Sequence, residues 1–445
     1  MKTLIKHANI VNEGAVFEGD LLINDDLIEQ ISTSISSPSN NTKVIDAKGN
    51  YLIPGFIDDQ VHFREPGLTH KESIKTGSKA AISGGITSFI EMPNTNPQTT
   101  NFNELNRKFD IAARESYANY SFMFGGTNDN LELIKQINPK EVAGLKLFLG
   151  SSTGNMLVDD EKVLEAIFKE SPVIISTHCE DESTIKKNLD NYQKEYGDAI
   201  PIEKHPLIRS EEACYLSSSS AVSLAKKTEA RLHVFHLSTE KELSLFTDKI
   251  PLKDKNITAE VCLHHLWFND EQYAALGSHI KWNPAVKKES DRQALIKAFN
   301  SDLIDVFATD HAPHTIEEKD SPYTSCPSGG PMVQHALPAL FEMLHNGETT
   351  IENIVKKTSH NPARLFDIEK RGFIKEGYKA DLVLVDTSAP FTVNRENLFY
   401  KCKWSPMMGN TFQTRVLYTI VNGKIAYENF KFSDIKCGEK LSFNR

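Results

Sequence analysis

The sequence predicts an α/β protein, a (β/α)8 barrel that carries a smaller β unit built from both ends of the chain. Three observations support this prediction. The chain has 445 residues, which is long for a single small core. Its middle alternates short apolar runs with longer helical segments, and eight such runs can be counted. Its two ends consist instead of short β-like pieces separated by turn residues.

The β unit is expected to draw on two distant parts of the chain. Residues 1–50 contain the pieces TLIKHANIV, GDLLIND, LIEQIS and KVIDAKG. After Arg371 the chain returns to pieces of the same kind, namely GFIKEG, ADLVLVD, TRVLYTIVNG and KIAYENF. We therefore expect residues 1–50 and 371–445 to form one β domain, and residues 51–370 to form the barrel.

Eight apolar runs supply the predicted barrel strands. In chain order they are YLIPGFIDDQVHFR, GITSFIEMPN, NYSFMFGG, GLKLFLGSS, PVIISTHCED, RLHVFHLS, ITAEVCLHH and IDVFATDHAPH. Helical stretches such as HKESIKTGSKAAIS and DEKVLEAIFKE lie between most of them. Near-continuous apolar strands are typical of a parallel sheet covered by helices, and in such barrels the chemistry gathers where the strands end. All runs except the third, which ends in glycines, end in polar groups.

Five polar side chains from five of these runs are expected at one end of the barrel. They are His62, Lys146, His178, His236 and Asp310. Each has an ordinary structural explanation when it is taken alone. A strand-end histidine often makes only a hydrogen bond, Lys146 could point toward the surrounding helices, and Asp310 could cap the next helix. Together they favour a metal site, because imidazole and carboxylate are ligands of zinc and related divalent ions.

Lys146 is the unusual member of this set, because an ammonium group is a poor metal ligand. Carbon dioxide can convert a lysine amine into a carbamate, whose two oxygens could bridge two cations. This chemistry requires that Lys146 point into the barrel. Strand alternation separates the two sides of the strand but does not decide which side faces inward.

Composition and charge exclude several classes of function. The formal net charge is −10, whereas a surface that binds nucleic acid or an anionic membrane requires positive charge. No apolar stretch reaches membrane-spanning length, and the first residues lack the long apolar core of a signal peptide. The six cysteines are scattered without a C-x-x-C pair, which is typical of reduced thiols in a cytoplasmic protein. We therefore expect a cytoplasmic protein without a nucleic-acid or membrane partner.

Several segments together carry a resemblance that runs nearly from end to end. They are PGFIDDQVHFREPG, GGITSFIEMPNTNP, GLKLFLG, STHCED, VFHLST, TAEVCLHHL, KWNPAVKKESDRQAL, FATDHAPHT, HNPARLF and GYKADLVLVD. With these motifs the chain resembles the dihydroorotase family of the amidohydrolase superfamily. The resemblance implies a distorted (β/α)8 TIM barrel with a small β-sandwich formed by the N- and C-terminal segments. It also implies the reversible cyclisation of N-carbamoyl-L-aspartate to L-dihydroorotate and water, in de novo pyrimidine (UMP) biosynthesis.

The resemblance implies a zinc site with one or two ions. His62 would bind the first zinc, and His178 and His236 would bind the second. The carbamate of Lys146 would bridge them. Asp310 would bind the first zinc and carry a proton between water and the leaving nitrogen. A bound metal can lower the pKa of water from ~15.7 toward ~7, which would supply hydroxide for attack on an amide at neutral pH.

The resemblance also implies residues that hold the substrate. The set that would contact its carboxylate and ring comprises Arg64, Asn94, His314, Asn283 and Gly329. The substrate carries a carboxylate in both directions of the reaction, and an arginine offers it a planar two-pronged donor. The competing structural explanation for Arg64 is a salt bridge to Glu65 or Asp58.

The chain departs from the family pattern at two places that bear on the site. Gln60-Val61-His62 stands where the family usually has His-x-His, and Met332-Val333-Gln334 replaces a common Gly-Leu-Glu stretch. An amide oxygen is a weak zinc ligand, so we expect the first zinc to bind less tightly than the second, unless Gln60 instead hydrogen-bonds water or Asp310. A further expectation concerns the polar loop at 150–159, where Ser152 or Thr153 would close over the substrate.

Two other functions remain open at this point. One is a different cyclic amidohydrolase, acting on dihydropyrimidine, hydantoin or allantoin. Those substrates lack the acidic side group, so Arg64 would have less to do. The other is a non-catalytic relative that serves as a scaffold for aspartate carbamoyltransferase. Such proteins typically lose several ligands together, whereas most ligands and Asp310 are present here. The expected partner is a small-molecule substrate, and a homodimer is the assembly considered.

Overall fold

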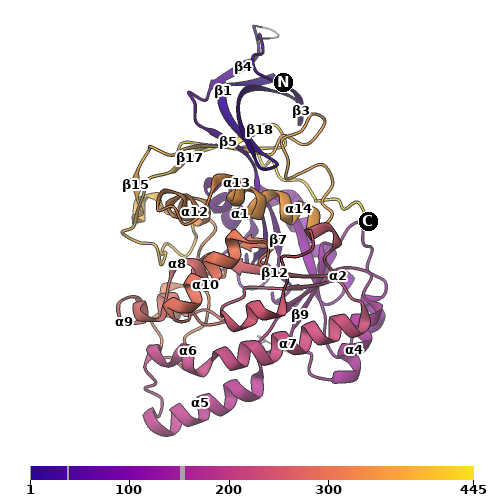
Figure 1. The fold of residues 1–445 in the computed structure, drawn as a ribbon, viewed down its shortest axis with the longest axis vertical. Coiled ribbons are helices and arrows are strands. Elements are labelled where there is room, and N and C mark those ends of the chain that lie inside the picture. The colour runs from indigo at the N-terminus through magenta and orange to yellow at the C-terminus, as the bar shows by residue number, and fades with distance from the viewer. Residues whose placement is uncertain (1, 38–39, 151–155) are drawn as a thin grey trace.

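The barrel is a sheet of eight parallel strands in simple chain order (Figure 1). The structure, a computed structural model, describes residues 2–37, 40–150 and 156–445. The barrel strands are β6 (Phe56–Val61), β7 (Ile86–Glu91), β8 (Asn119–Gly125), β9 (Gly144–Phe148), β10 (Ile175–His178), β11 (Leu232–Val234), β12 (Ile257–Cys262) and β13 (Val306–Ala308). A parallel bridge between Val61 and His311 brings the last strand beside the first, so the barrel is nearly closed. Each predicted apolar run contains one barrel strand, and the predicted fold class is confirmed.

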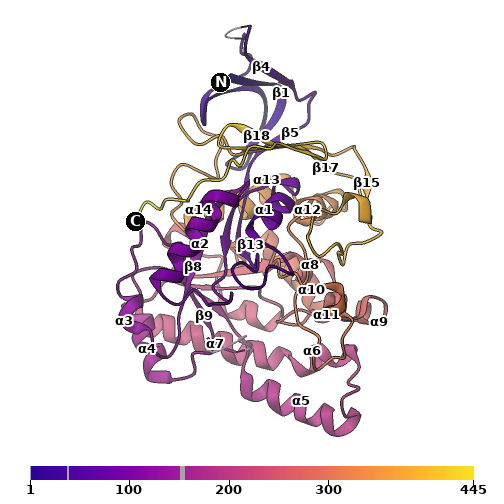
Figure 2. The ribbon, with the colours of Figure 1, turned by 180° about the vertical axis from the view of Figure 1, so that it is seen from behind.

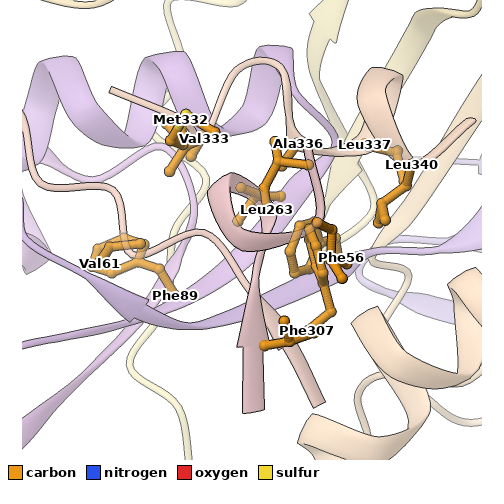
Figure 3. Close-up of a cluster of buried hydrophobic side chains, with 14 of the residues drawn as sticks. Phe56, Val61, Phe89, Leu263, Phe307, Met332, Val333, Ala336, Leu337 and Leu340 are labelled. Atoms are coloured by element: carbon orange, nitrogen blue, oxygen red, sulfur yellow. The ribbon is translucent and has the colours of Figure 1, made fainter. Parts of the chain in front are cut away.

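Burial on both faces explains why the barrel strands read as apolar runs. Every residue of β6, β7, β8, β9 and β10 is buried. The outer face packs against the helices in one large hydrophobic cluster, part of which Figure 3 shows. In it the Phe56 and Phe307 rings lie 5.8 Å apart, in the same cluster as Leu337 and Leu340 of α12 (Ala336–His345).

The helices around the barrel begin where the sequence supplies a capping side chain. Ser73 and Thr76 form a capping box at the start of α1, and Asp160 accepts hydrogen bonds from two backbone N–H groups at the start of α4. The main helices are α1 (Ile74–Ser83), α2 (Phe102–Glu115), α4 (Glu161–Glu170), α5 (Glu182–Tyr196), α7 (Glu211–Thr228), α10 (Glu289–Asn300) and α12. The two helical stretches singled out in the sequence are confirmed as α1 and α4. Among the described residues, no helix is both long and apolar enough to cross a membrane.

Shorter helical pieces complete the connections. They are α3 (Leu131–Ile134), α6 (His205–Ile208), α8 (Leu263–Trp267), α9 (Tyr273–Leu276), α11 (Ile316–Lys319), α13 (Ile351–Val355), the π-helical turn η6 (Lys356–His360) and α14 (Asn361–Leu365). The last of these, α14, packs at the barrel end opposite the strand C-termini. There its side chains join Ile57, Ile174 and Val306 of the barrel and Phe443 near the C-terminus in a separate apolar cluster.

Both ends of the chain share one nine-stranded sheet, which lies at the end of the molecule away from α5 (Figures 1 and 2). Its strands are β1 (Lys2–Asn12), β2 (Ala15–Asn24), β3 (Leu27–Ser32), β4 (Lys43–Asp46), β5 (Tyr51–Pro54), β14 (Leu382–Asp386), β17 (Arg415–Val421), β18 (Lys424–Glu428) and β19 (Lys431–Phe432). A short pair, β15 (Phe391–Thr392) and β16 (Thr411–Phe412), stands apart. Because β5 pairs with β1 and β14, we propose Gly55 as the junction between this β unit and the barrel.

One predicted strand is wrong. The piece GFIKEG, residues 372–377, forms turns in the structure. Gly372 and Gly377 have φ angles of +78° and +80°, in the left-handed region that β-strands do not use. Ile374 between them is buried against the core of the nine-stranded sheet, and this burial explains the strand-like pattern.

Candidate active site

A cavity of about 170 Å³ opens at the C-terminal ends of the barrel strands. All ten candidate residues line it, and so does Gln60. The ten are His62, Arg64, Asn94, Lys146, His178, His236, Asn283, Asp310, His314 and Gly329. The structure therefore brings together side chains that lie as far apart in sequence as Gln60 and Gly329. The proposed loop contact through Ser152 or Thr153 lies outside the described residues.

Three of these residues have a backbone conformation that is uncommon for non-glycine residues. Arg64, His236 and Asp310 have φ angles of +64°, +40° and +44°. Each follows the end of its barrel strand, β6, β11 or β13, by two or three positions. Such conformations cost free energy and persist where the surrounding structure enforces them, most often at functional sites. Here they turn the three side chains into the same cavity.

His178 and His236 face each other through ring nitrogens that suit a metal ion. The distance between His178 Nδ1 and His236 Nε2 is 3.0 Å. His178 Nε2 donates to Glu180 Oε2 at 2.9 Å, which leaves a lone pair on Nδ1 in the neutral ring. Burial lowers the pKa of both histidines, so the neutral form is favoured. A metal-binding histidine held from behind by a carboxylate has this arrangement.

His62 and Asp310 form a second pair of the same kind. His62 Nδ1 donates to Asn94 Oδ1 at 2.7 Å, so its Nε2 carries a lone pair when the ring is neutral. That nitrogen lies 3.2 Å from Asp310 Oδ1. Burial lowers the pKa of His62, and two acceptors facing each other need a cation between them. Asn94, the expected substrate-binding residue, lines the cavity and also orients His62.

Lys146 points into the barrel, which settles the side that the sequence left open. Its side chain is buried, and its Nζ makes no hydrogen bond to any described residue. The amine lies 4.0 Å from the centre of the Phe235 ring and 5.1 Å from that of Phe148. Burial lowers the pKa of Lys146 to about 8, so the neutral amine that reacts with carbon dioxide is more accessible than in an ordinary lysine.

Gln60 contacts Asp310, as one of the two sequence hypotheses proposed. Its Nε2 donates to Asp310 Oδ1 at 3.2 Å, and its Oε1 faces the Cys262 thiol at 3.7 Å. The side chain thus holds the carboxylate that faces His62. A histidine at this position would offer a stronger zinc donor than this amide.

The opposite wall of the cavity presents convergent hydrogen-bond donors. Lys71 Nζ lies 2.9 Å from His314 Nδ1, and because an ammonium only donates, the ring proton must be on Nε2. That N–H lies 3.0 Å from Ser328 O and 3.0 Å from Arg64 Nη2. The Nε2–H donates to Ser328 O, so the Arg64–His314 contact joins two donors. An anionic oxygen in the cavity would accept from Arg64 and would share or replace Ser328 O as the acceptor for His314. Arg64 forms no salt bridge to Glu65 or Asp58 among the described residues, and its Nε donates to Pro313 O.

A loop over the cavity completes this wall. Asn283 Oδ1 accepts a hydrogen bond from Ser328 Oγ at 2.9 Å. Gly329 has a φ of +117°, and a Cβ there would lie 2.5 Å from the Ala312 carbonyl oxygen, so only glycine fits. Its N–H donates to Lys281 O and is therefore not free for a ligand. Because Gly329 has no side chain, a ligand can come close to its backbone.

Sequence reasoning missed some supporting residues and overweighted one departure. Glu180 orients His178, and Lys71 fixes the His314 tautomer; a carboxylate two residues after a histidine was the available signal for Glu180. Met332 and Val333 lie in the hydrophobic cluster outside the cavity lining (Figure 3). Met332 and Val333 therefore contribute to core packing, and none of residues 332–334 lines the cavity.

Comparisons with known proteins agree with this architecture. The amidohydrolase family model matches residues 51–426. A dihydroorotase of Carboxydothermus hydrogenoformans is 32% identical over 444 residues, which cover 96% of this chain and 98% of the relative. A dihydroorotase of Clostridium acetobutylicum is 34% identical over 436 residues, which cover 96% of this chain and 99% of the relative.

Solved structures of cyclic amidohydrolases superpose on nearly the whole chain. An L-hydantoinase (dihydropyrimidinase) from Arthrobacter aurescens matches with a TM-score of 0.93 at 23% identity, over 99% of both chains. A dihydropyrimidinase from Brevibacillus agri matches with a TM-score of 0.89 at 24% identity, over 100% of both chains. At these identities the likeness establishes the fold alone.

Proposed function

The chain belongs to the amidohydrolase family, and we propose that it is a metal-dependent dihydroorotase. It interconverts N-carbamoyl-L-aspartate with L-dihydroorotate and water, a step of pyrimidine biosynthesis. The observation that carries this proposal is the pair of donors, Arg64 and His314, facing the same cavity as two pairs of metal-binding side chains. Near full-length relatives named dihydroorotase support it.

The proposed metal positions follow from the two pairs described above. His62 and Asp310 would hold the first zinc, His178 and His236 the second, and the carbamate of Lys146 would lie between them. The donor set fits zinc, because neutral imidazole and carboxylate are its usual nitrogen and oxygen ligands. When bound, the metal would lower the pKa of a water molecule and polarise the amide carbonyl.

The chain's own residues perform the remaining tasks. During hydrolysis, a carboxylate oxygen of Asp310 receives a proton from the attacking water and delivers it to the ring nitrogen as the amide bond opens. During cyclisation the proton moves in the opposite direction. Gln60, which donates to Oδ1, holds that carboxylate in place. Arg64 and the His314 Nε2–H bind the substrate carboxylate. Asn283 and the loop that contains Gly329 contact the substrate ring.

This reading is favoured over the two alternatives by specific contacts. A dihydropyrimidinase or hydantoinase substrate has no carboxylate to place between Arg64 and His314. A scaffold has no need for a buried lysine amine that makes no hydrogen bond to any described residue and lies among two pairs of possible metal ligands. The test against a scaffold is a zinc-loaded assay in both directions, before and after a chelator. Turnover that disappears with the metal and returns with zinc supports the enzyme, and its absence in both directions supports the scaffold.

The cellular setting and assembly belong to the same proposal. All six cysteines are free thiols, and five of them are buried, which supports the expected cytoplasmic location. The partner is the small-molecule substrate. A homodimer stays a prediction that sedimentation would test.

A first prediction concerns Gln60. We expect the purified protein to contain less of the first zinc than of the second, and added zinc to raise activity. Gln60→His should raise the zinc content without abolishing turnover, because imidazole is a stronger donor than an amide oxygen. Metal analysis of both proteins at a buffered zinc concentration measures this. Two fully bound zincs that survive a mild chelator and persist in Gln60→Ala would show that position 60 does not matter to the metal.

A second prediction concerns Lys146. Lys146→Ala should lose bound zinc and most activity, because the bridging carbamate can no longer form. Short carboxylic acids such as acetate should restore part of the activity by filling the space. Lys146→Arg is the matched control, since it keeps a cation in place and leaves no space for the added acid. Full zinc content in Lys146→Ala would contradict the bridging role.

A further inference from the structure

A second group of possible ligands lies inside the barrel. It consists of Asp59 on β6, His233 on β11 and Glu260 on β12, and the potential ligand atoms of the three all lie within 4.8 Å of one another. Each of the three side chains is fully buried. None of them lines the active-site cavity at the C-terminal ends of the barrel strands, which we call the mouth of the barrel, and none belongs to the proposed catalytic set.

The tautomer of His233 is set by hydrogen bonds on its other side. Thr258 Oγ1 donates its proton to the Leu232 carbonyl oxygen at 3.2 Å, so it can only accept from His233 Nδ1, which lies 2.8 Å away. The proton of neutral His233 is therefore on Nδ1. Its Nε2 lone pair points at Asp59 Oδ2 and Glu260 Oε2, at 3.4 and 3.6 Å.

Burial lowers the pKa of His233, but its contacts with Asp59 and Glu260 outweigh burial and raise that pKa to about 9, so without a metal the ring holds a second proton. The separations nevertheless suit a shared metal cation better than that proton. Charge-assisted N–H···O bonds are ~2.7–2.9 Å long, and neither carboxylate oxygen reaches that distance from the ring. By contrast, two ligands that each lie ~2.0–2.2 Å from a tetrahedral zinc are ~3.3–3.6 Å apart. Within the described chain, His233 Nε2, both Asp59 oxygens and Glu260 Oε2 have no hydrogen-bond partner.

A neighbouring hydroxyl supplies an independent indication of a ligand. Ser176 pairs directly with His233 in the parallel ladder of β10 and β11, so both side chains lie on the same face of the barrel sheet. Ser176 is fully buried, and its Oγ has no hydrogen-bond partner among the described residues. A buried hydroxyl is seldom left unsatisfied, and this one stands in the ladder between His233 on β11 and Lys146 on β9.

We propose that Asp59, His233 and Glu260 form a second metal site inside the barrel, specific for a divalent ion of the zinc class. One imidazole and two carboxylates match that ion, and its two positive charges balance the two buried carboxylates. The site would also support the mouth. Glu260 Oε1 accepts a hydrogen bond from the backbone N–H of His236 at 3.2 Å, at the residue whose φ is +40°. A metal bound to Oε2 would fix the position of Glu260. Glu260 would in turn stabilise the turn that directs His236 into the cavity.

The experiment locates zinc independently of activity. Crystals of the zinc-loaded wild-type protein are measured on both sides of the zinc absorption edge. We expect an anomalous peak between His233 Nε2, Asp59 and Glu260, separate from any peak at the mouth. A mouth peak without an interior peak would overturn the inference and leave the proposed function intact, and in that case His233 is an imidazolium between the two carboxylates.

Variants give a second, quantitative test. His178→Ala/His236→Ala removes the ligands of the second zinc in the cavity and leaves only the first position, where zinc is expected to bind weakly. Tightly bound zinc should therefore remain at the interior site. Adding Asp59→Asn to this double variant should lower its zinc affinity by at least ~10-fold, because removing even a residue that only hydrogen-bonds to a metal ligand costs that much. The matched control is Asp320→Asn, at an exposed aspartate, which should change nothing. Equal zinc affinity with and without Asp59→Asn would contradict the site, and the wild-type anomalous map decides if the multiple variant fails to fold.

Discussion

Replacing Asp310 by asparagine is expected to lower kcat by at least ~10²-fold in both directions of the reaction. The amide has nearly the same shape and can still lie between Gln60 and His62, but it cannot receive and return a proton at neutral pH. Asp310 is the carboxylate that faces His62 at 3.2 Å and accepts from Gln60 at 3.2 Å. Steady-state rates with dihydroorotate and with carbamoyl aspartate, at matched zinc content, measure the effect.

The control for this substitution must separate proton transfer from metal loss. Zinc content is determined for each protein, and Asp320→Asn serves as a carboxylate-to-amide change at an exposed position. A large loss of kcat with retained zinc supports the proton-transfer role. Near-normal turnover in Asp310→Asn would contradict that role directly.

Replacing Arg64 by leucine is expected to cost ~2–5 kcal/mol in transition-state binding of dihydroorotate, because the substrate carboxylate loses its charged partner in a buried site. At ~1.4 kcal/mol per tenfold, this corresponds to a ~30- to ~4,000-fold lower kcat/KM. Arg64 is buried, and burial lowers its pKa to about 10, so it remains charged at neutral pH. The loss should be much smaller for dihydrouracil, which has no carboxylate.

Arg64→Lys is the matched control. It keeps the charge but loses the planar two-pronged geometry, so its kcat/KM for dihydroorotate should fall between those of wild type and Arg64→Leu. An equal loss of kcat/KM for dihydroorotate and dihydrouracil in Arg64→Leu would show that the arginine stabilises the structure around the cavity and does not bind the substrate carboxylate.

The barrel was predictable because its strands are buried on both faces and therefore read as apolar runs. Five candidate residues, His62, Lys146, His178, His236 and Asp310, could be expected in one place because parallel strands end on one side of a barrel. The other five were implied by the family resemblance. The orientation of Lys146 was not predictable, since the period of two leaves both faces open. The turn at residues 372–377 was mistaken for a strand because Ile374 is buried between two glycines with positive φ.

Contacts between distant segments account for what else the sequence could not supply. Asn94 orients His62 from the segment that follows β7, and Lys71 fixes the His314 tautomer across more than two hundred positions. The interior group of Asp59, His233 and Glu260 sits in three strands that meet only in the closed barrel. Its members looked like isolated polar residues in apolar runs, a pattern that does not by itself indicate a ligand set.

The most direct test of the proposed function compares the activity of the zinc-loaded wild-type protein on four substrates. L-dihydroorotate, dihydrouracil, hydantoin and allantoin are offered in turn, and kcat/KM is compared. We predict hydrolysis of dihydroorotate, its formation from N-carbamoyl-L-aspartate, and little activity on the three rings without a carboxylate, because only dihydroorotate places an anion between Arg64 and His314. A preference for dihydrouracil, hydantoin or allantoin over dihydroorotate would contradict the assignment.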